Sequence, residues 1–114
     1  MLAEFLEQVK TQPDIIAFTQ TMEVIAAHYD FLPTGFTCGE QRNEAGTNEG
    51  SCKILAFAQA NQLTPQQTLH LFGDYYRVDV LQHPDGQDHG NIRNFIAAGW
   101  SGVSFDQPAL QARP

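Results

Sequence analysis

The chain has 114 residues, a length that fits one domain and excludes a second hydrophobic core. With 42% hydrophobic residues and eight phenylalanines it has the material for a packed interior, which excludes a disordered segment. Thirteen acidic residues against six basic ones give a net charge of −7, so neither nucleic acid nor an anionic membrane surface is an expected partner.

Two helices are predicted in the N-terminal part of the chain. Apolar residues at helical spacing predict a first helix from the start of the chain to Thr11. The segment Thr11-Gln12-Pro13-Asp14 then has a capping threonine and a proline in the first turn, and predicts a second helix that runs to about Tyr29. The apolar stripe of this second helix is expected in the core: Ile15, Phe18, Met22, Ile25, Ala26 and Tyr29.

Residues 30–50 have no sustained period and predict a long loop. The brief alternation around Phe36-Thr37-Cys38 is typical of a short strand or hairpin arm within it. Because long structureless connections are uncommon in compact domains, such a loop tends either to be functional or to contain short elements.

Three helices are predicted in the second half. Ser51 is expected to cap a central helix whose apolar residues 54–58 point all round its axis, which indicates burial on most sides. The capping box at 64–67 opens a helix that Gly73 interrupts and that then continues to about Leu81. Asp88 is expected to cap the last helix, which ends at Gly99.

These elements predict a mainly α fold. We expect a compact single-domain bundle of about five helices, with one long loop near residues 30–50 that contains a short β-hairpin if the alternation there forms strands. The domain spans residues 1–106, and residues 107–114 are expected to be a frayed C-terminal tail.

The strongest candidate for a site is the segment 43–53, which reads N-E-A-G-T-N-E-G-S-C-K. A polar, glycine-rich loop that leads into the start of a helix brings unpaired backbone N–H groups and a thiol together. Such a place can bind an anion or activate the thiol as a nucleophile. The loop is expected to fold over the start of the central helix and to meet the Asp88 turn there. The binding candidates are Asn43, Glu44, Asn48, Ser51, Arg77 and Arg93.

The two arginines have two interpretations. Pairing of Arg77 and Arg93 with acidic side chains would tie the long loop to the helices; the available partners are Glu44, Glu49, Asp74 and Asp88. Alternatively, they recognise a carboxylate or phosphate in a cleft.

A second hypothesis makes Cys52 a catalytic nucleophile. A cysteine in the first turn of a helix has its thiolate favoured by the helix dipole. His89 would act as its base, with Asn91 or Asn43 orienting the imidazole. The alternative is that Cys52 is a small buried hydrophobe, as free cysteines usually are. The residues leave open whether the chain is an enzyme.

The turn that contains His83, Asp85, Asp88 and His89 has the residue types of a metal site. Nitrogen and carboxylate ligands suit zinc, but the spacing matches none of the strong ligand patterns, and a calcium loop would need a closing glutamate. We therefore predict neither a metal site nor a cofactor.

Several motifs together resemble the HopJ family, called type III effectors after members in plant-pathogenic bacteria. The resemblance extends from about Phe5 to Phe105 and is carried by Tyr29-Asp30-Phe31, Asn43-Glu44-Ala45-Gly46, Asn48, Gly50-Ser51-Cys52-Lys53, Gly73, Tyr75-Tyr76-Arg77, Asp88-His89, Asn91-Ile92-Arg93-Asn94-Phe95 and Gly99-Trp100. It implies a small, mainly helical bacterial protein and brings no catalytic residue with it.

Three functions are consistent with this resemblance. The first is a binding or interaction domain that holds an unidentified protein or a small anionic ligand, and the second is a cysteine-dependent hydrolase or transferase with the Cys52/His89 pair. The third is a housekeeping cytoplasmic protein or an acidic secretion chaperone. We expect the bacterial cytoplasm as its location, and a host cell only if the effector assignment holds, since Glu4 and Glu7 lie on a predicted helix whereas type III export signals are typically flexible and poor in acidic residues.

Overall fold

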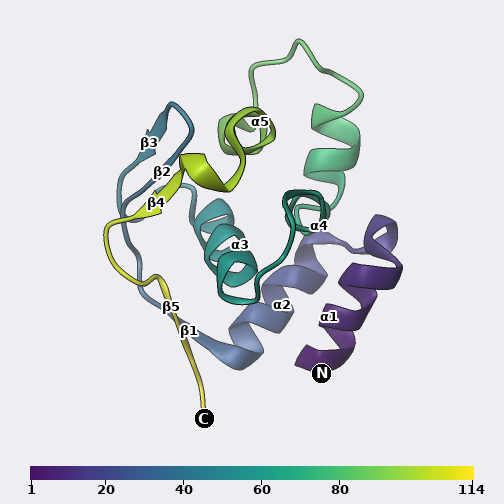
Figure 1. The fold of residues 1–114 in the computed structure, drawn as a ribbon, viewed down its shortest axis with the longest axis vertical. Helices are drawn as coiled ribbons and strands as arrows, with labels where there is room; N and C mark the ends of the chain where they lie inside the picture. The colour runs from purple at the N-terminus through teal and green to yellow at the C-terminus, as the bar shows by residue number, and fades with distance from the viewer.

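Helices form the middle and one side of the molecule, and short strands lie on the other side (Figure 1). The computed structural model describes residues 1–114. Its five α-helices are α1 (Leu2–Thr11), α2 (Phe18–His28), α3 (Glu49–Ala60), α4 (Pro65–His70) and α5 (Gly90–Ala98). Three further helical segments are η1 (Pro13–Ile15), the π-helical turn η2 (Tyr75–Val80) and η3 (Gly99–Gly102). None of these helices combines the length and apolar character that a membrane span requires.

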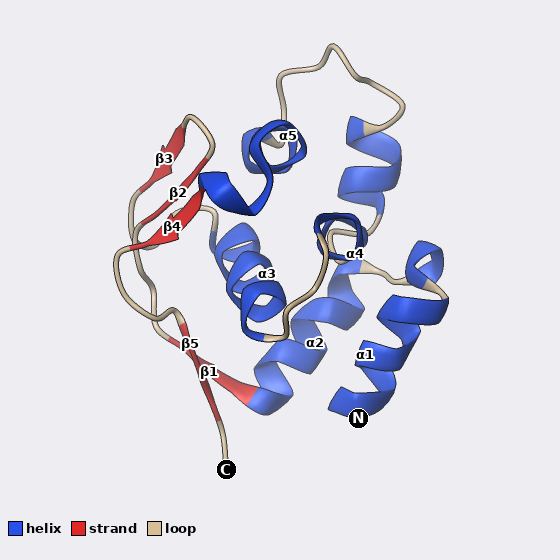
Figure 2. Cartoon of the chain, in the orientation of Figure 1, coloured by secondary structure: helices blue, strands red, loops and turns tan.

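The strands form two small antiparallel sheets (Figure 2). One sheet pairs β1 (Tyr29–Phe31) with β5 (Leu110–Ala112), and the other has β2 (Phe36–Cys38) between β3 (Gln41–Asn43) and β4 (Val103–Phe105). The β2–β3 pair is the hairpin expected within the loop. The fold is therefore helical with a sheet component, and not a purely helical bundle.

The predicted frayed tail is wrong, because residues 110–112 form a strand. In the β1–β5 pair, Tyr29 lies opposite Ala112 and Phe31 opposite Leu110. The side chain of Ala109 is buried, and Arg113 forms an ion pair with Asp30 at 2.9 Å. The tail is ordered because an open strand edge at residues 29–31 offers its backbone groups a partner far away in sequence.

The predicted second helix is split. Residues 13–15 form the turn η1, and α2 begins only at Phe18, while the Thr11 hydroxyl donates to the Glu7 carbonyl instead of capping a new helix. Arg77 explains the break, because its guanidinium donates to the carbonyls of Pro13 and Ile16, which a continuous helix would use internally. Ile15, expected in the core, is consequently 59% exposed, and Ile16 is fully buried in its place.

The predicted capping box and the interruption at Gly73 are confirmed. The Thr64 hydroxyl accepts from the Gln67 N–H at 3.1 Å, and the Gln67 side chain accepts from the Thr64 N–H at 2.9 Å. Gly73 has φ +63°, and a Cβ there would lie 2.6 Å from the backbone nitrogen of Phe18. Glycine is therefore required both by the conformation and by the close approach of α2.

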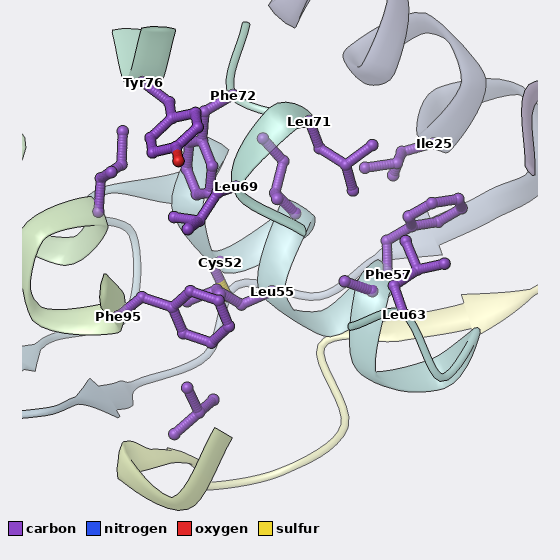
Figure 3. Close-up of a cluster of buried hydrophobic side chains, with 14 of the residues drawn as sticks. Ile25, Cys52, Leu55, Phe57, Leu63, Leu69, Leu71, Phe72, Tyr76 and Phe95 are labelled. Carbon is purple, nitrogen blue, oxygen red and sulfur yellow. The ribbon is translucent and has the colours of Figure 1, made fainter. Parts of the chain in front are cut away.

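The central position of α3 is also confirmed. Cys52, Leu55 and Phe57 are at most 1% exposed. Figure 3 shows them among side chains that come from α2, α4 and α5, such as Ile25, Leu69 and Phe95. A helix buried on most sides holds its first turn in one place, and the candidate site is built on that first turn.

Candidate functional site

A cleft of about 270 Å³ lies where the first turns of α3 and α5 meet. It joins the glycine-rich segment to the Asp88–His89 turn, which confirms that the loop folds over the start of the central helix. Its walls come from α2, β3, α3, the segment after α4, and α5. The eleven lining residues are Phe18, Gln41, Asn48, Gly50, Ser51, Phe72, Tyr75, His89, Gly90, Asn91 and Ile92.

Both helices begin at a residue in the left-handed conformation. Asn48 precedes α3 with φ 50° and His89 precedes α5 with φ 53°, so the predicted caps Ser51 and Asp88 are wrong by one to three residues. Neither helix has a side-chain cap. Asn and His are among the residues that adopt this conformation most readily, although a sequence pattern for caps does not include it.

The first turn of each helix leaves backbone N–H groups without a partner in the protein. The first intrahelical acceptors are Asn48, which receives the Cys52 N–H at 3.0 Å, and His89, which receives the Arg93 N–H at 3.1 Å. The three preceding N–H groups of each helix, at residues 49–51 and 90–92, have no protein acceptor. Five of these six residues line the cleft.

A pair of buried amides supports the floor of the cleft. Asn43 and Asn91 are 2% and 4% exposed and exchange two hydrogen bonds, from Asn43 Nδ2 to Asn91 Oδ1 at 2.9 Å and from Asn91 Nδ2 to Asn43 Oδ1 at 3.0 Å. Asn48 Nδ2 donates to the same Asn43 oxygen at 2.8 Å. These bonds join β3, the start of α3 and the start of α5, so two of the predicted binding residues position the helix starts.

One side of the cleft is aromatic. The rings of Phe18 and Tyr75 meet edge to face with centroids 5.0 Å apart, and the Tyr75 ring lies 5.1 Å from the His89 ring. Gly50 allows this packing, because a Cβ at that position would lie 3.0 Å from the Phe18 ring. The cleft thus combines an apolar wall with a wall of hydrogen-bond donors.

His89 lies between two carboxylates at the edge of the cleft. Its Nε2 is 2.9 Å from Asp79 Oδ2 and 3.8 Å from Asp88 Oδ2. Arg93 bonds to Asp88 Oδ1 at 2.7 Å, and this bond holds the pKa of Asp88 below its usual value. The predicted pairing of Arg93 with Asp88 is therefore confirmed. The guanidinium also donates to the carbonyls of Asp79, His83, Pro84 and Asp88.

Cys52 is not part of the cleft wall. Its side chain is 1% exposed and its sulfur lies 3.9 Å from the Thr34 carbonyl oxygen. Burial raises the pKa of this thiol to about 11, so it is protonated at neutral pH despite its place in the first turn of α3. His89 is bonded to Asp79 and Asn91 to Asn43. This arrangement gives no support to the Cys52/His89 pair, which stays a prediction.

Arg77 and Glu44 lie apart from the cleft wall. Arg77 has no carboxylate partner, contrary to one of its two interpretations, and its donors go to the carbonyls of Pro13, Ile16 and His70. Glu44 is exposed and lies 3.6 Å from Arg42, which pairs with Asp106. The interpretation from sequence missed Gln41, Asp79 and the exposed face of Tyr75, because their neighbours at the site are distant in sequence.

Comparison with known proteins gives a family and one very similar structure. The family model of the HopJ type III effector proteins matches residues 2–110. A crystal structure described as that of the unknown function protein VPA0580 has 48% sequence identity and a TM-score of 0.98, covering 99% of this chain and 94% of the other. No curated protein matches the chain.

Proposed function

This chain belongs to the HopJ type III effector family, and we propose that it is a non-catalytic binding domain whose ligand occupies the cleft between α3 and α5. The solved relative is itself described as of unknown function, so the proposal depends on the chemistry of the cleft. That chemistry favours a small molecule that carries one anionic group and one apolar or aromatic group.

The observation that carries the proposal is the meeting of two uncapped helix starts at one cleft. Each helix N-terminus is equivalent to a positive charge of roughly half a unit, and its free N–H groups are donors with no competing partner in the protein. A carboxylate or phosphate in this position would accept hydrogen bonds from both helices. Gln41 and Asn48 add amide groups, and Ser51 adds a hydroxyl, all within the lining of the cleft.

The aromatic side of the cleft favours a ligand whose second part is apolar or aromatic. Phe18, Phe72 and Tyr75 line it, and Tyr75 is 44% exposed, so a ring or short alkyl chain would cover apolar surface that now faces solvent. Asp79 and Asp88 lie nearby, and the protein carries a net charge of −7, so a large polyanion would be repelled. An aryl carboxylate such as benzoate is the simplest probe with both parts.

The test places a negative charge in the first turn of α3. Ser51→Asp puts a carboxylate where the ligand anion would lie, and a carboxylate in that turn is compatible with the helix dipole, so the variant should fold. Ser51→Asn is the matched neutral control. Backbone amide shifts of Gly50, Ser51 and Gly90 are followed by NMR at low ionic strength while benzoate or inorganic phosphate is added, because salt would screen the attraction.

We expect saturable shifts of these amides in the wild type and in Ser51→Asn, and their loss in Ser51→Asp. Benzoate should bind more tightly than phosphate because only benzoate reaches the aromatic wall. The proposal fails if the amides of both helix starts stay unmoved, or if Ser51→Asp responds like the wild type.

The family name raises the separate question of export. Family membership is consistent with secretion into a host cell, but α1 buries Phe5 and Val9 in the core and would have to unfold for the N-terminal residues to act as an extended signal. We propose that this chain acts in the bacterial cytoplasm. A reporter fused to residues 1 to 50 and expressed in a secretion-competent host tests this, and translocation of the reporter would contradict it.

A further inference from the structure

Three metal-binding side chains converge beside the cleft, from two separate segments of the chain. Asp79 comes from η2, and Asp88 and His89 come from the turn before α5. The ligand atoms of all three lie within 4.8 Å of one another, with His89 Nε2 between the two carboxylates at 2.9 and 3.8 Å. His89 faces the cleft, whereas Asp79 and Asp88 are not among the residues that line it.

The spacing is close to what a small divalent ion needs, and the widest separation among the three ligand atoms, up to 4.8 Å, must shorten when an ion binds. Zinc binds histidine nitrogen and carboxylate oxygen at about 2.0–2.2 Å, so two ligand atoms in a tetrahedral shell are roughly 3.4 Å apart. The two distances from His89 Nε2 lie on either side of this value. The imidazole is decisive for the kind of ion, because calcium and magnesium prefer oxygen ligands only, whereas zinc and its neighbours among the transition metals accept nitrogen.

Arg93 holds the Asp88 carboxylate and the backbone of Asp79 in place without using the atoms that would bind the metal. Its guanidinium bonds to Asp88 Oδ1 and to the Asp79 carbonyl, which leaves Asp88 Oδ2 and Asp79 Oδ2 directed at the imidazole. Ligating carboxylates are commonly oriented by a second hydrogen-bonding partner of this kind. Gly86 lets the turn approach the arginine, because a Cβ there would lie 2.6 Å from Arg93 Nη2.

We propose that Asp79, Asp88 and His89 bind one divalent transition-metal ion of the zinc type. Three protein ligands leave at least one coordination position for water or for a further ligand. The binding of the metal does not depend on the anionic ligand of the cleft.

The test measures zinc binding by the full chain in the absence of any candidate anion. The metal-free protein competes with a chromogenic zinc chelator, which gives both stoichiometry and affinity. The ligand variants are Asp79→Asn, Asp88→Asn and His89→Gln, and the matched controls are His83→Gln and Asp85→Asn, which change the same residue types in the same exposed turn. Far-ultraviolet circular dichroism of each metal-free variant verifies the fold.

We expect one zinc ion per chain in the wild type, a loss of affinity of about tenfold or more in each ligand variant, and a change below about twofold in the controls. Absence of stoichiometric binding by the wild type overturns the proposal. So does a folded Asp79→Asn variant that binds zinc as tightly as the wild type, because Asp79 is the ligand that brings the second segment to the site.

Discussion

Two factors change the pKa of the Cys52 thiol in opposite directions: its position in the first turn of a helix and its burial in the core. The helix dipole favours the thiolate, but burial outweighs it and raises the pKa to about 11. Cys38 is buried as well, and burial raises the pKa of its thiol to about 11. Two thiols that are both in the core and both protonated act as small hydrophobic groups.

We predict that neither cysteine is reactive in the folded protein. A pKa about two units above that of a free thiol leaves roughly 100-fold less thiolate at neutral pH, and burial slows access further. A thiol reagent such as DTNB should therefore label the native protein at least about 100-fold more slowly than it labels a small-molecule thiol, and guanidinium chloride should restore the rate. Cys38→Ser isolates Cys52. A native Cys52 that reacts as fast as the free thiol would support the nucleophile hypothesis instead.

The buried amides of Asn43 and Asn91 lead to a prediction about stability. Asn43→Ala leaves the buried Asn91 amide without its partner and costs about 2–3 kcal/mol, whereas Asn91→Ala costs about 1–2 kcal/mol because Asn43 keeps its bonds to Phe36 and Asn48. The double variant should cost clearly less than the sum of the two, with a coupling of about 1–2 kcal/mol, because each single variant already breaks both bonds between the two amides. Urea unfolding of the wild type, the two single variants and the double variant gives the free energies of unfolding for this double-mutant cycle. Strictly additive losses would show that the two amides act independently.

At the scale of elements, the sequence predicts what a few consecutive residues decide. The capping box at Thr64 and Gln67 needs only its own four residues, and it forms as expected. The start of α2 depends on Arg77, which is about sixty residues away, and it was predicted wrongly for that reason. Strand β5 likewise forms only because the distant β1 offers it an edge.

The candidate site likewise has a part that the sequence predicts and a part that depends on distant contacts. The loop residues Asn43, Asn48 and Ser51 were expected to meet the turn at His89, and the structure brings them to one cleft or its floor. Asp79 could not be placed there from sequence, because its helical spacing relates it to His83, four residues on, and not to His89, ten residues on. Only the fold brings its carboxylate to the imidazole.

The glycine before η2 supports a prediction at this scale. In Gly73→Ala the alanine must adopt the left-handed conformation of Gly73. Its Cβ would also lie 2.6 Å from the backbone nitrogen of Phe18, so α2 and the segment after α4 must separate. We expect a loss of about 3 kcal/mol or more. Gly46→Ala is the matched control, since Gly46 has φ +89° with no atom within 4 Å, and it should lose only about 1 kcal/mol. Equal losses in thermal or urea unfolding would mean that the contact with Phe18 adds nothing.

At the scale of the whole molecule, the two sheets tie the long loop to the C-terminal part of the chain. β5 pairs with β1 at the beginning of the loop, and β4 pairs with β2 in its middle. β3, which carries Gln41 and Asn43 to the cleft, is held through β2. The C-terminal strand β5 therefore helps to hold the loop whose strand β3 reaches the candidate site.

Removal of the last strand tests this arrangement. A chain that ends at residue 106 loses the β1–β5 pairing and the burial of Ala109 and Leu110, and we expect it to be less stable by about 2 kcal/mol or more in urea unfolding. Arg113→Ala is the control, because an exposed ion pair to Asp30 is worth at most about 1 kcal/mol. Amide exchange of residues 36–43 should also become faster in the shortened chain, since the loop loses its anchor at residue 30. If stability and exchange both stay as in the full chain, the tail is frayed in solution, and the pairing with β1 does not hold the loop over the start of α3.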